Sequence, residues 1–140
     1  MVSYLEIKKR HVELREKVRH HRNIDIDEFA WGRDEFQAWR NNMTQCFYCG
    51  ITAMQSEQYY NVIGAFRTPW NNANGMSTRG KSLEIDRYNN MQGYSEANCR
   101  CACYYCNNAK SDVFNGDQFM PIGQAIGDRI REALGGNVPH

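Results

Sequence analysis

The sequence lacks a long hydrophobic run, although 41% of its 140 residues are hydrophobic. A transmembrane helix needs about 20 consecutive apolar residues, so no membrane span is expected. A secretory signal is not expected either, because the first residues, MVSYLEIKKR, become charged at once. Internal repeats and low-complexity segments are also lacking. We therefore expect a cytoplasmic protein without a membrane partner.

A strong overall charge is lacking too. The formal net charge is +1, so the whole molecule is not an obvious binder of polyanions. The charge is unevenly placed, however, because residues 1–22 contain seven Lys or Arg and three Glu. This segment predicts a helix over Ser3–His21, with a thin apolar stripe and with Glu13 and Lys17 at the favourable i, i+4 spacing.

Two interpretations of this first helix remain open. It is either a solvated amphipathic helix packed on the domain or a basic arm that lies on a phosphate backbone. In the second interpretation, the residues that contact nucleic acid are Lys8, Lys9 and Arg10.

Disulfide bonds are not expected, although the chain has six cysteines. Four of them form two separated Cys-x-x-Cys pairs, Cys46 with Cys49 and Cys103 with Cys106, and this spacing is typical of zinc ligands. Four thiolates leave no open coordination position, so the zinc ion is expected to be structural.

The two remaining cysteines lie close to the second pair. Cys99 and Cys101 alternate along an expected strand, and we predict that both are small buried side chains. In the alternative interpretation, Cys101 replaces Cys103 as a zinc ligand.

The length of 140 residues predicts one domain with flanking helices. Apolar and charged residues alternate in LEIDR (83–87), which predicts a strand. A turn containing Gly93 follows, then a second strand after Asn98 and a helix from about Asn107. The expected order is therefore strand, turn, strand and helix, held by zinc.

Helices are also expected outside this unit. Asp34 is a candidate cap for a short helix carrying Phe36 and Trp39, and we assign Trp39 to the core rather than to base stacking. Residues 56–65 predict a short helix, and residues 118–134 predict an amphipathic helix that packs on the domain.

Residues 66–80 are rich in Asn, Gly and Pro and predict a long irregular loop. Loops of this length are often functional. Two interpretations stay open: a solvated insertion, or a loop that turns Arg67, Trp70 and Arg79 towards nucleic acid.

Four motifs, CFYCG, LEIDR, GYSEAN and CACYYCNNAK, together resemble the HNH nucleases, the ββα-metal or His-Me finger class, in their zinc-stapled form. The resemblance covers roughly residues 43–115 and is strongest to small phage-type HNH proteins that carry Asp-Arg in place of Asp-His. It implies an α+β fold with a small zinc-bound ββα-metal core. A helical extension (1–42) would precede this core (43–115), and a C-terminal helix (116–140) would pack on it. A phage-encoded protein would act in the host cytoplasm.

The resemblance also assigns site residues. Asp86 and Asn107 would hold one catalytic Mg²⁺ or Mn²⁺, for which their hard oxygen atoms are suited. Asn98 would tie the loop between the strands and orient the general base. Lys110 and Ser111 would reach a phosphate from the same helix, although Lys110 is equally interpretable as an ordinary solvated lysine.

Arg87 stands where the family usually has the histidine that activates water. Arginine stays protonated and has no acceptor, so it cannot be the base, but it suits bidentate binding of a phosphate. Three sources of a base remain: a metal-bound hydroxide, Glu84, or a distant histidine, among His11, His20 and His21.

The sequence thus predicts a metal-dependent endonuclease that nicks or cuts DNA, with RNA as a further substrate to test. Two alternatives are an inactive HNH-like zinc module that binds nucleic acid and a zinc-knuckle adaptor that binds a protein. Because Asp86 lies outside the four thiolates, we expect Asp86→Ala to remove activity and leave thermal stability nearly unchanged. The oligomeric state is not indicated by any pattern in the sequence.

Overall fold

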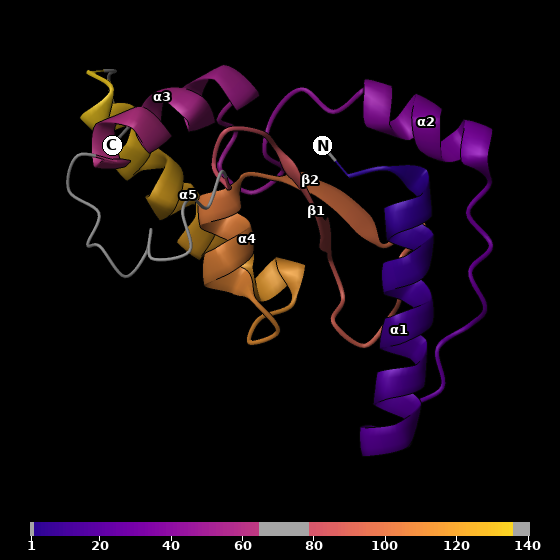
Figure 1. Cartoon of the computed structure of the whole chain (residues 1–140). Helices are drawn as coiled ribbons and strands as arrows, with labels where there is room; N and C mark the ends of the chain where they lie inside the picture. Colours follow the sequence, from indigo (N-terminus) through magenta and orange to yellow (C-terminus); the bar gives the residue numbers. More distant parts are fainter. Residues whose placement is uncertain (1, 65–78, 136–140) are drawn as a thin grey trace.

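A two-stranded hairpin lies between two groups of helices in the computed structural model, which describes residues 2–64 and 79–135 (Figure 1). The elements in chain order are α1 (Tyr4–Arg22), α2 (Arg33–Asn41), α3 (Ala53–Gly64), β1 (Glu84–Arg87), β2 (Cys99–Ala102), α4 (Tyr104–Lys110) and α5 (Gly116–Ala133). The predicted α+β class is confirmed.

The hairpin and α4 form the expected ββα unit. Strands β1 and β2 are antiparallel, with a register that runs from Glu84 opposite Ala102 to Arg87 opposite Cys99. Helix α4 follows at once, because Cys103 is its N-cap and its Sγ accepts the Cys106 N–H at 3.4 Å. The helix thus starts earlier than predicted, and Asn107 lies inside it.

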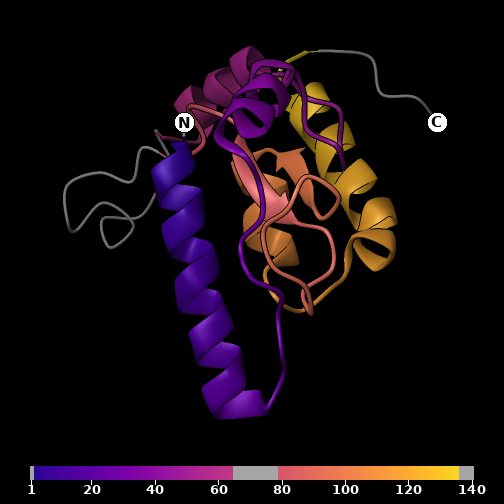
Figure 2. The same ribbon diagram turned by 90° about the vertical axis from the view of Figure 1, so that its right-hand side faces the viewer.

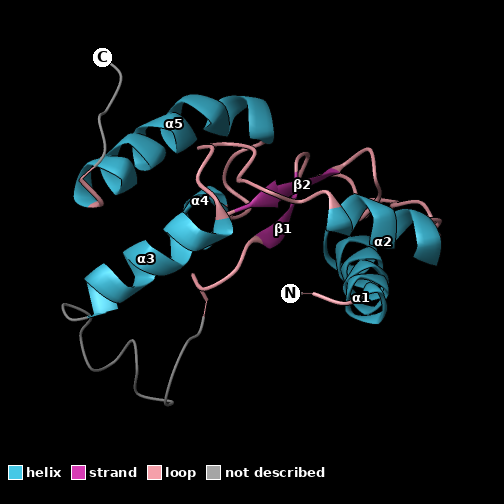
Figure 3. Cartoon of the chain, turned by 90° about the horizontal axis from the view of Figure 1, so that it is seen from above, coloured by secondary structure: helices cyan, strands magenta, loops and turns pink. Residues whose placement is uncertain are grey.

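Helices cover the hairpin from two sides, as the view from above shows (Figure 3). Helices α3, α4 and α5 lie on one side, where a core cluster surrounds the cysteine pairs and includes Tyr48, Ile51 and Phe119. Helices α1 and α2 lie on the other side, where Ile7, Trp31, Phe36, Ile85 and Cys99 form a second cluster.

Helix α1 confirms the first sequence prediction. Its N-cap is Ser3, whose Oγ accepts the Glu6 N–H at 3.2 Å. It ends at Asn23, which has a φ of 52°, in the left-handed region that often terminates helices. Ile7 and His11 are buried, so one face of the helix packs on the domain.

The starts of α2 and α3 differ from the positions that the sequence predicts. The N-cap of α2 is Gly32 and not the expected Asp34, which lies in the first turn. At the start of α3, Thr52 Oγ1 accepts the Gln55 N–H at 3.2 Å and Gln55 Oε1 accepts the Thr52 N–H at 3.0 Å. This reciprocal pair moves the helix start to Ala53.

Helix α5 packs closely on the first cysteine pair. It begins with a capping box between Asn115 and Gln118. A Cβ on Gly123 would lie 2.6 Å from Tyr48 Cβ, and one on Gly127 would lie 2.7 Å from Cys49 Cβ. Arg131 donates to the Cys49 carbonyl at 2.8 Å. The predicted packing role of this helix is therefore confirmed.

Other sequence predictions have different outcomes. Trp39 is partly buried against the second core cluster, as expected. Arg67 and Trp70 lie outside the described residues, and the division at residues 42 and 115 stays a prediction. Among the described residues, no helix has both the length and the apolar character to cross a membrane.

Candidate active site and zinc centre

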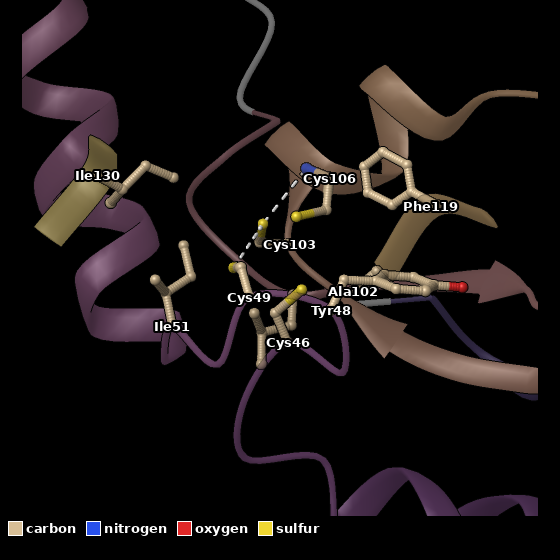
Figure 4. Packing of buried hydrophobic residues seen from close by; sticks show 10 residues of the cluster. Cys46, Tyr48, Cys49, Ile51, Ala102, Cys103, Cys106, Phe119 and Ile130 are labelled. Carbon is tan, nitrogen blue, oxygen red and sulfur yellow. Dashed lines mark hydrogen bonds between the residues drawn. The ribbon is translucent and has the colours of Figure 1, made fainter. Parts of the chain in front are cut away.

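The two Cys-x-x-Cys pairs come together as one cluster. The Sγ atoms of Cys46, Cys49, Cys103 and Cys106 all lie within 4.8 Å of one another, and those of Cys49 and Cys103 are 3.7 Å apart. A tetrahedral zinc with Zn–S bonds of about 2.3 Å separates its sulfurs by about 3.8 Å. The sulfurs point towards a common centre (Figure 4), so the donor set fits a closed, structural zinc site.

Backbone hydrogen bonds shape this site. Gly50, with a φ of 79°, turns the chain after Cys49 and donates to the Cys46 carbonyl at 2.9 Å. Phe47 donates to the carbonyl of Cys101 at 2.7 Å. Cys101 therefore supports the zinc loop through its backbone and does not replace Cys103 in the thiol cluster.

The thiols of Cys99 and Cys101 lie outside the four-thiol cluster. Burial raises the pKa of Cys99 to about 12. Burial, with the negative charge of Cys46 and Cys49, raises the pKa of Cys101 to about 12. Cys99 is buried as predicted, whereas Cys101 is only partly buried.

A pocket of about 160 Å³ lies where β1, α1 and the end of α4 meet. It brings together five of the predicted site residues with a further acid, and these lining residues are Arg10, Asp86, Arg87, Asn107, Ser111 and Asp112. Residues far apart in the sequence thus border one pocket beside the ββα unit.

Asp86 is buried and has a fixed orientation. Its Oδ2 accepts the Tyr48 hydroxyl at 2.5 Å, and its Oδ1 accepts the Lys110 ammonium at 3.3 Å. Burial raises the pKa of Asp86, and the Tyr48 hydrogen bond and the Lys110 charge oppose this rise. The carboxylate therefore belongs to a buried ion pair at the edge of the pocket.

Lys110 has a different position from the one predicted. Its side chain is fully buried, and its ammonium donates to the Arg87 carbonyl, Asn90 Oδ1 and Asp86 Oδ1 at 2.8, 3.3 and 3.3 Å. An ammonium group has three donors, and all three are used. Neither the predicted phosphate contact nor the solvated lysine agrees with this position, whereas Ser111 does line the pocket.

Glu84 is held by two partners. Arg79 donates to both of its carboxylate oxygens, at 3.0 and 2.9 Å, and Asn107 Nδ2 donates to Oε1 at 3.0 Å. Burial alone raises the pKa of Glu84, but the hydrogen bonds from Arg79 and Asn107 lower it overall. A carboxylate stabilised in this way is a weak base, which argues against Glu84 as the activator of water.

Arg87 lies at the pocket edge with its guanidinium anchored. Nη1 donates to the carbonyls of Asn90 and Gln92 at 3.0 and 2.9 Å, and Nη2 lies 3.4 Å from Asp112 Oδ1. Its side chain is only 11% exposed. The carbonyl groups of the loop after β1 therefore hold the Arg87 guanidinium in place at the pocket edge.

Asn98 ties that loop, as the resemblance implies. Its Nδ2 donates to the carbonyls of Asn89 and Gly93 at 3.1 and 2.9 Å, and its Oδ1 accepts the Asn89 N–H at 2.9 Å. His11 supports the same loop, because its Nδ1 accepts the Tyr94 N–H at 2.9 Å. His11 Nε2 lies 2.8 Å from the Asp27 carbonyl, so both ring nitrogens are engaged and His11 cannot act as the base.

The three basic residues predicted to contact phosphate separate on α1. Arg10 lines the pocket, although its Nε also donates to Glu6 Oε1 at 3.2 Å. Lys8 and Lys9 are exposed, and neither lines this pocket.

Tyr48, Asn90 and the Arg79–Glu84 pair were not expected from the sequence. Tyr48 stands between two zinc ligands, and its position relative to Asp86 depends on the zinc loop packing against β1. The sequence leaves open a contact of Arg79 with nucleic acid, but Arg79 binds Glu84 and its Cζ lies 4.6 Å from the Tyr104 ring centroid. No local pattern signals these pairings.

A larger cavity lies elsewhere among the described residues. It measures about 740 Å³ and is bordered by five acidic residues, Asp25, Asp27, Glu28, Glu35 and Glu96. Such a lining repels phosphate, so this cavity is not a candidate for binding nucleic acid.

The hairpin and α4, with the four-cysteine cluster and an aspartate on β1, form a ββα unit beside a candidate metal centre. Among solved structures the chain is similar to PacI, a rare-cutting HNH restriction endonuclease described as having an extraordinary mechanism of DNA perturbation. The two are 23% identical, with a TM-score of 0.58 over 93% of this chain and 82% of that chain. No family model and no curated protein matches the chain. The likeness confirms the HNH fold inferred from the motifs.

Proposed function

We propose that this chain is a metal-dependent endonuclease that hydrolyses DNA phosphodiester bonds at the pocket of Asp86, Arg87 and Asn107. The observation that carries the proposal is that these three residues, which match the catalytic positions of the motifs, border one small pocket beside the hairpin. The fold shared with a restriction endonuclease supports the same proposal.

Asp86 Oδ1 and the amide oxygen of Asn107 would hold Mg²⁺ or Mn²⁺. The set fits in donor type, because both atoms are hard oxygens and such ions use few protein ligands. Asn107 uses its Nδ2 on Glu84, which leaves its oxygen for a cation. When bound, the ion would stabilise negative charge on the phosphate and on the departing oxygen.

The surrounding side chains orient this set and balance its charge. Tyr48 and Lys110 fix the Asp86 carboxylate. Arg10 and Arg87 add positive charge to the pocket lining, which favours a phosphate at the same place. The proton of the attacking water is accepted by neither His11 nor Glu84, because hydrogen bonds occupy both.

Plasmid nicking tests the proposal. Supercoiled plasmid is incubated with wild type, Asp86→Asn and, as control, Asp34→Asn on the exposed side of α2, each with and without Mg²⁺ or Mn²⁺. We expect nicking by wild type and Asp34→Asn only with metal, and a loss of at least a hundredfold in Asp86→Asn. Equal activity of Asp86→Asn and wild type would contradict the assigned site.

A second function is favoured by the ion pair of Lys110 and Asp86, since the ammonium occupies one side of the carboxylate that would bind metal. In this function the chain is an inactive HNH module that binds nucleic acid. Retention of DNA without nicking by wild type on duplex, single-stranded and RNA substrates would select it. Failure of both nicking and retention would select the protein-binding adaptor.

A further inference from the structure

A second groove lies beside the catalytic pocket. It also measures about 160 Å³ and is lined by the C-terminal half of α1 together with Arg87, Asn90 and Asp112. These last three residues line the catalytic pocket too. The two hollows therefore adjoin each other at the loop that follows β1.

One flank of α1 faces both hollows. Arg10, Leu14, Lys17 and His21 follow the i, i+4, i+7, i+11 spacing that places residues on one side of a helix. Arg10 lines the catalytic pocket, and the other three line the second groove. Arg10 to His21 spans about 16 Å along the helix axis, and Figure 2 shows the C-terminal half of α1 extending past the hairpin.

The groove is positively charged. Lys17, Arg22 and Arg87 line it against a single acid, Asp112, and His21 adds a further nitrogen donor. Leu14 and Val18 supply its apolar wall. Lys17, His21 and Arg22 are all exposed, and no ion pair involving Lys17 or Arg22 is found among the described residues.

We propose that this groove binds a backbone phosphate of nucleic acid that flanks the scissile one, through Lys17, His21 and Arg22. The inference rests on the proposed function, and it assigns a second surface that binds the same nucleic acid. Successive phosphates on one strand advance by about 3.4 Å along a duplex axis, so the flank from Arg10 to His21 spans roughly five nucleotides. A strand held at Arg87 can therefore continue along α1.

The same helix offers a matched control. Lys8 lies on the opposite flank and Lys9 on the outer face, since each residue advances about 100° around a helix. Lys8→Ala/Lys9→Ala removes the same charge as Lys17→Ala/Arg22→Ala from the same exposed helix. A general effect of net charge on binding would thus act equally on both double variants.

The test measures affinity of the zinc-loaded protein for a fluorescent DNA duplex between 50 and 200 mM salt, without Mg²⁺ or Mn²⁺ so that the duplex is not cleaved. Each phosphate contact contributes about 0.9 to the log–log salt slope. Loss of the contact with this one phosphate should lower the slope of Lys17→Ala/Arg22→Ala by about 0.9, a difference of about 3.5-fold across this range. The control should keep the wild-type slope, and His21→Ala should weaken binding at each salt concentration. Circular dichroism and zinc content confirm folding of every variant.

Equal slopes for the two double variants would overturn the groove, whether both fall or both stay at the wild-type value. Unchanged binding of His21→Ala would remove that residue from the assignment. Nicking is measured separately with Mg²⁺ or Mn²⁺. A wild type that never nicks but shows the expected difference in slope would refute the endonuclease and keep the groove. A wild type that nicks, with equal slopes, would refute the groove alone.

Discussion

The burial of the Asp86 carboxylate changes the stability expected of the Asp86→Ala variant. Its side chain is 6% exposed and that of its partner Lys110 is fully buried. Asp86→Ala would leave the Lys110 ammonium buried without its counter-charge, which typically costs about 3–5 kcal/mol. The sequence-based expectation that this variant keeps its stability is therefore replaced by the opposite one.

The prediction is that Asp86→Ala lowers the free energy of unfolding in urea by about 3–5 kcal/mol. Asp86→Asn should lose less, because its amide oxygen can still accept from Lys110. Replacing both partners, in Asp86→Leu/Lys110→Met, should recover part of the loss. If Asp86→Ala unfolds at the wild-type urea concentration, the buried ion pair contributes nothing to folding.

Residue identities could be predicted where the chemistry resides in a local motif. The four zinc cysteines and the loop-tying Asn98 follow from spacing and resemblance, and the structure brings both into the expected positions. The partners of Asp86, Glu84 and Lys110 could not be predicted, because each depends on tertiary packing. Tyr48 and Asp86, for example, are 38 residues apart.

At the scale of elements, the contact between α5 and the zinc loop depends on two glycines one helical turn apart. A Cβ at Gly127 would lie 2.7 Å from Cys49 Cβ and 2.8 Å from the Cys49 carbonyl oxygen. Contacts this short force the helix away from the loop. The packing of α5 is thus coupled to the position of a zinc ligand.

We therefore predict that Gly127→Ala lowers the free energy of unfolding by about 1–3 kcal/mol and speeds the loss of zinc to a chelator. Gln124→Ala, at an exposed position of the same helix, is the control and should change neither quantity. Zinc transfer to a colorimetric chelator and urea unfolding provide the two measurements. Equal rates of zinc loss from both variants would contradict the prediction that the packing of α5 affects zinc binding.

Element types were predictable from periodicity and element boundaries were not. The alternation in LEIDR and the apolar spacing of α1 and α5 each indicated the correct element. The starts of α3, α4 and α5 lie two or three residues earlier than expected, because the side chains of Thr52, Cys103 and Asn115 accept hydrogen bonds from backbone N–H groups of the first turn. Such caps override the apolar pattern, which begins only inside the helix.

For the whole molecule, the zinc site joins parts of the chain that the sequence separates widely. Cys49 and Cys103 are 54 residues apart, and the cluster lies in the core on which α4 and α5 pack. The protonation of the other two thiols depends on the folded core, because burial is the main cause that raises the pKa values of Cys99 and Cys101 to about 12. Removal of zinc should therefore make all six cysteines reactive in one step.

The last prediction follows from this coupling. At neutral pH the zinc-loaded protein should resist alkylation by iodoacetamide, because zinc holds four thiolates and the raised pKa values keep the thiols of Cys99 and Cys101 protonated. After treatment with a chelator, intact mass should show six modifications without a stable four-modified species. Cys103→Ser should lose zinc and react fully without chelator, whereas Cys101→Ser should retain zinc. Retention of zinc by Cys103→Ser would refute the ligand set, and a stable species modified at four cysteines would show that the core persists without the metal.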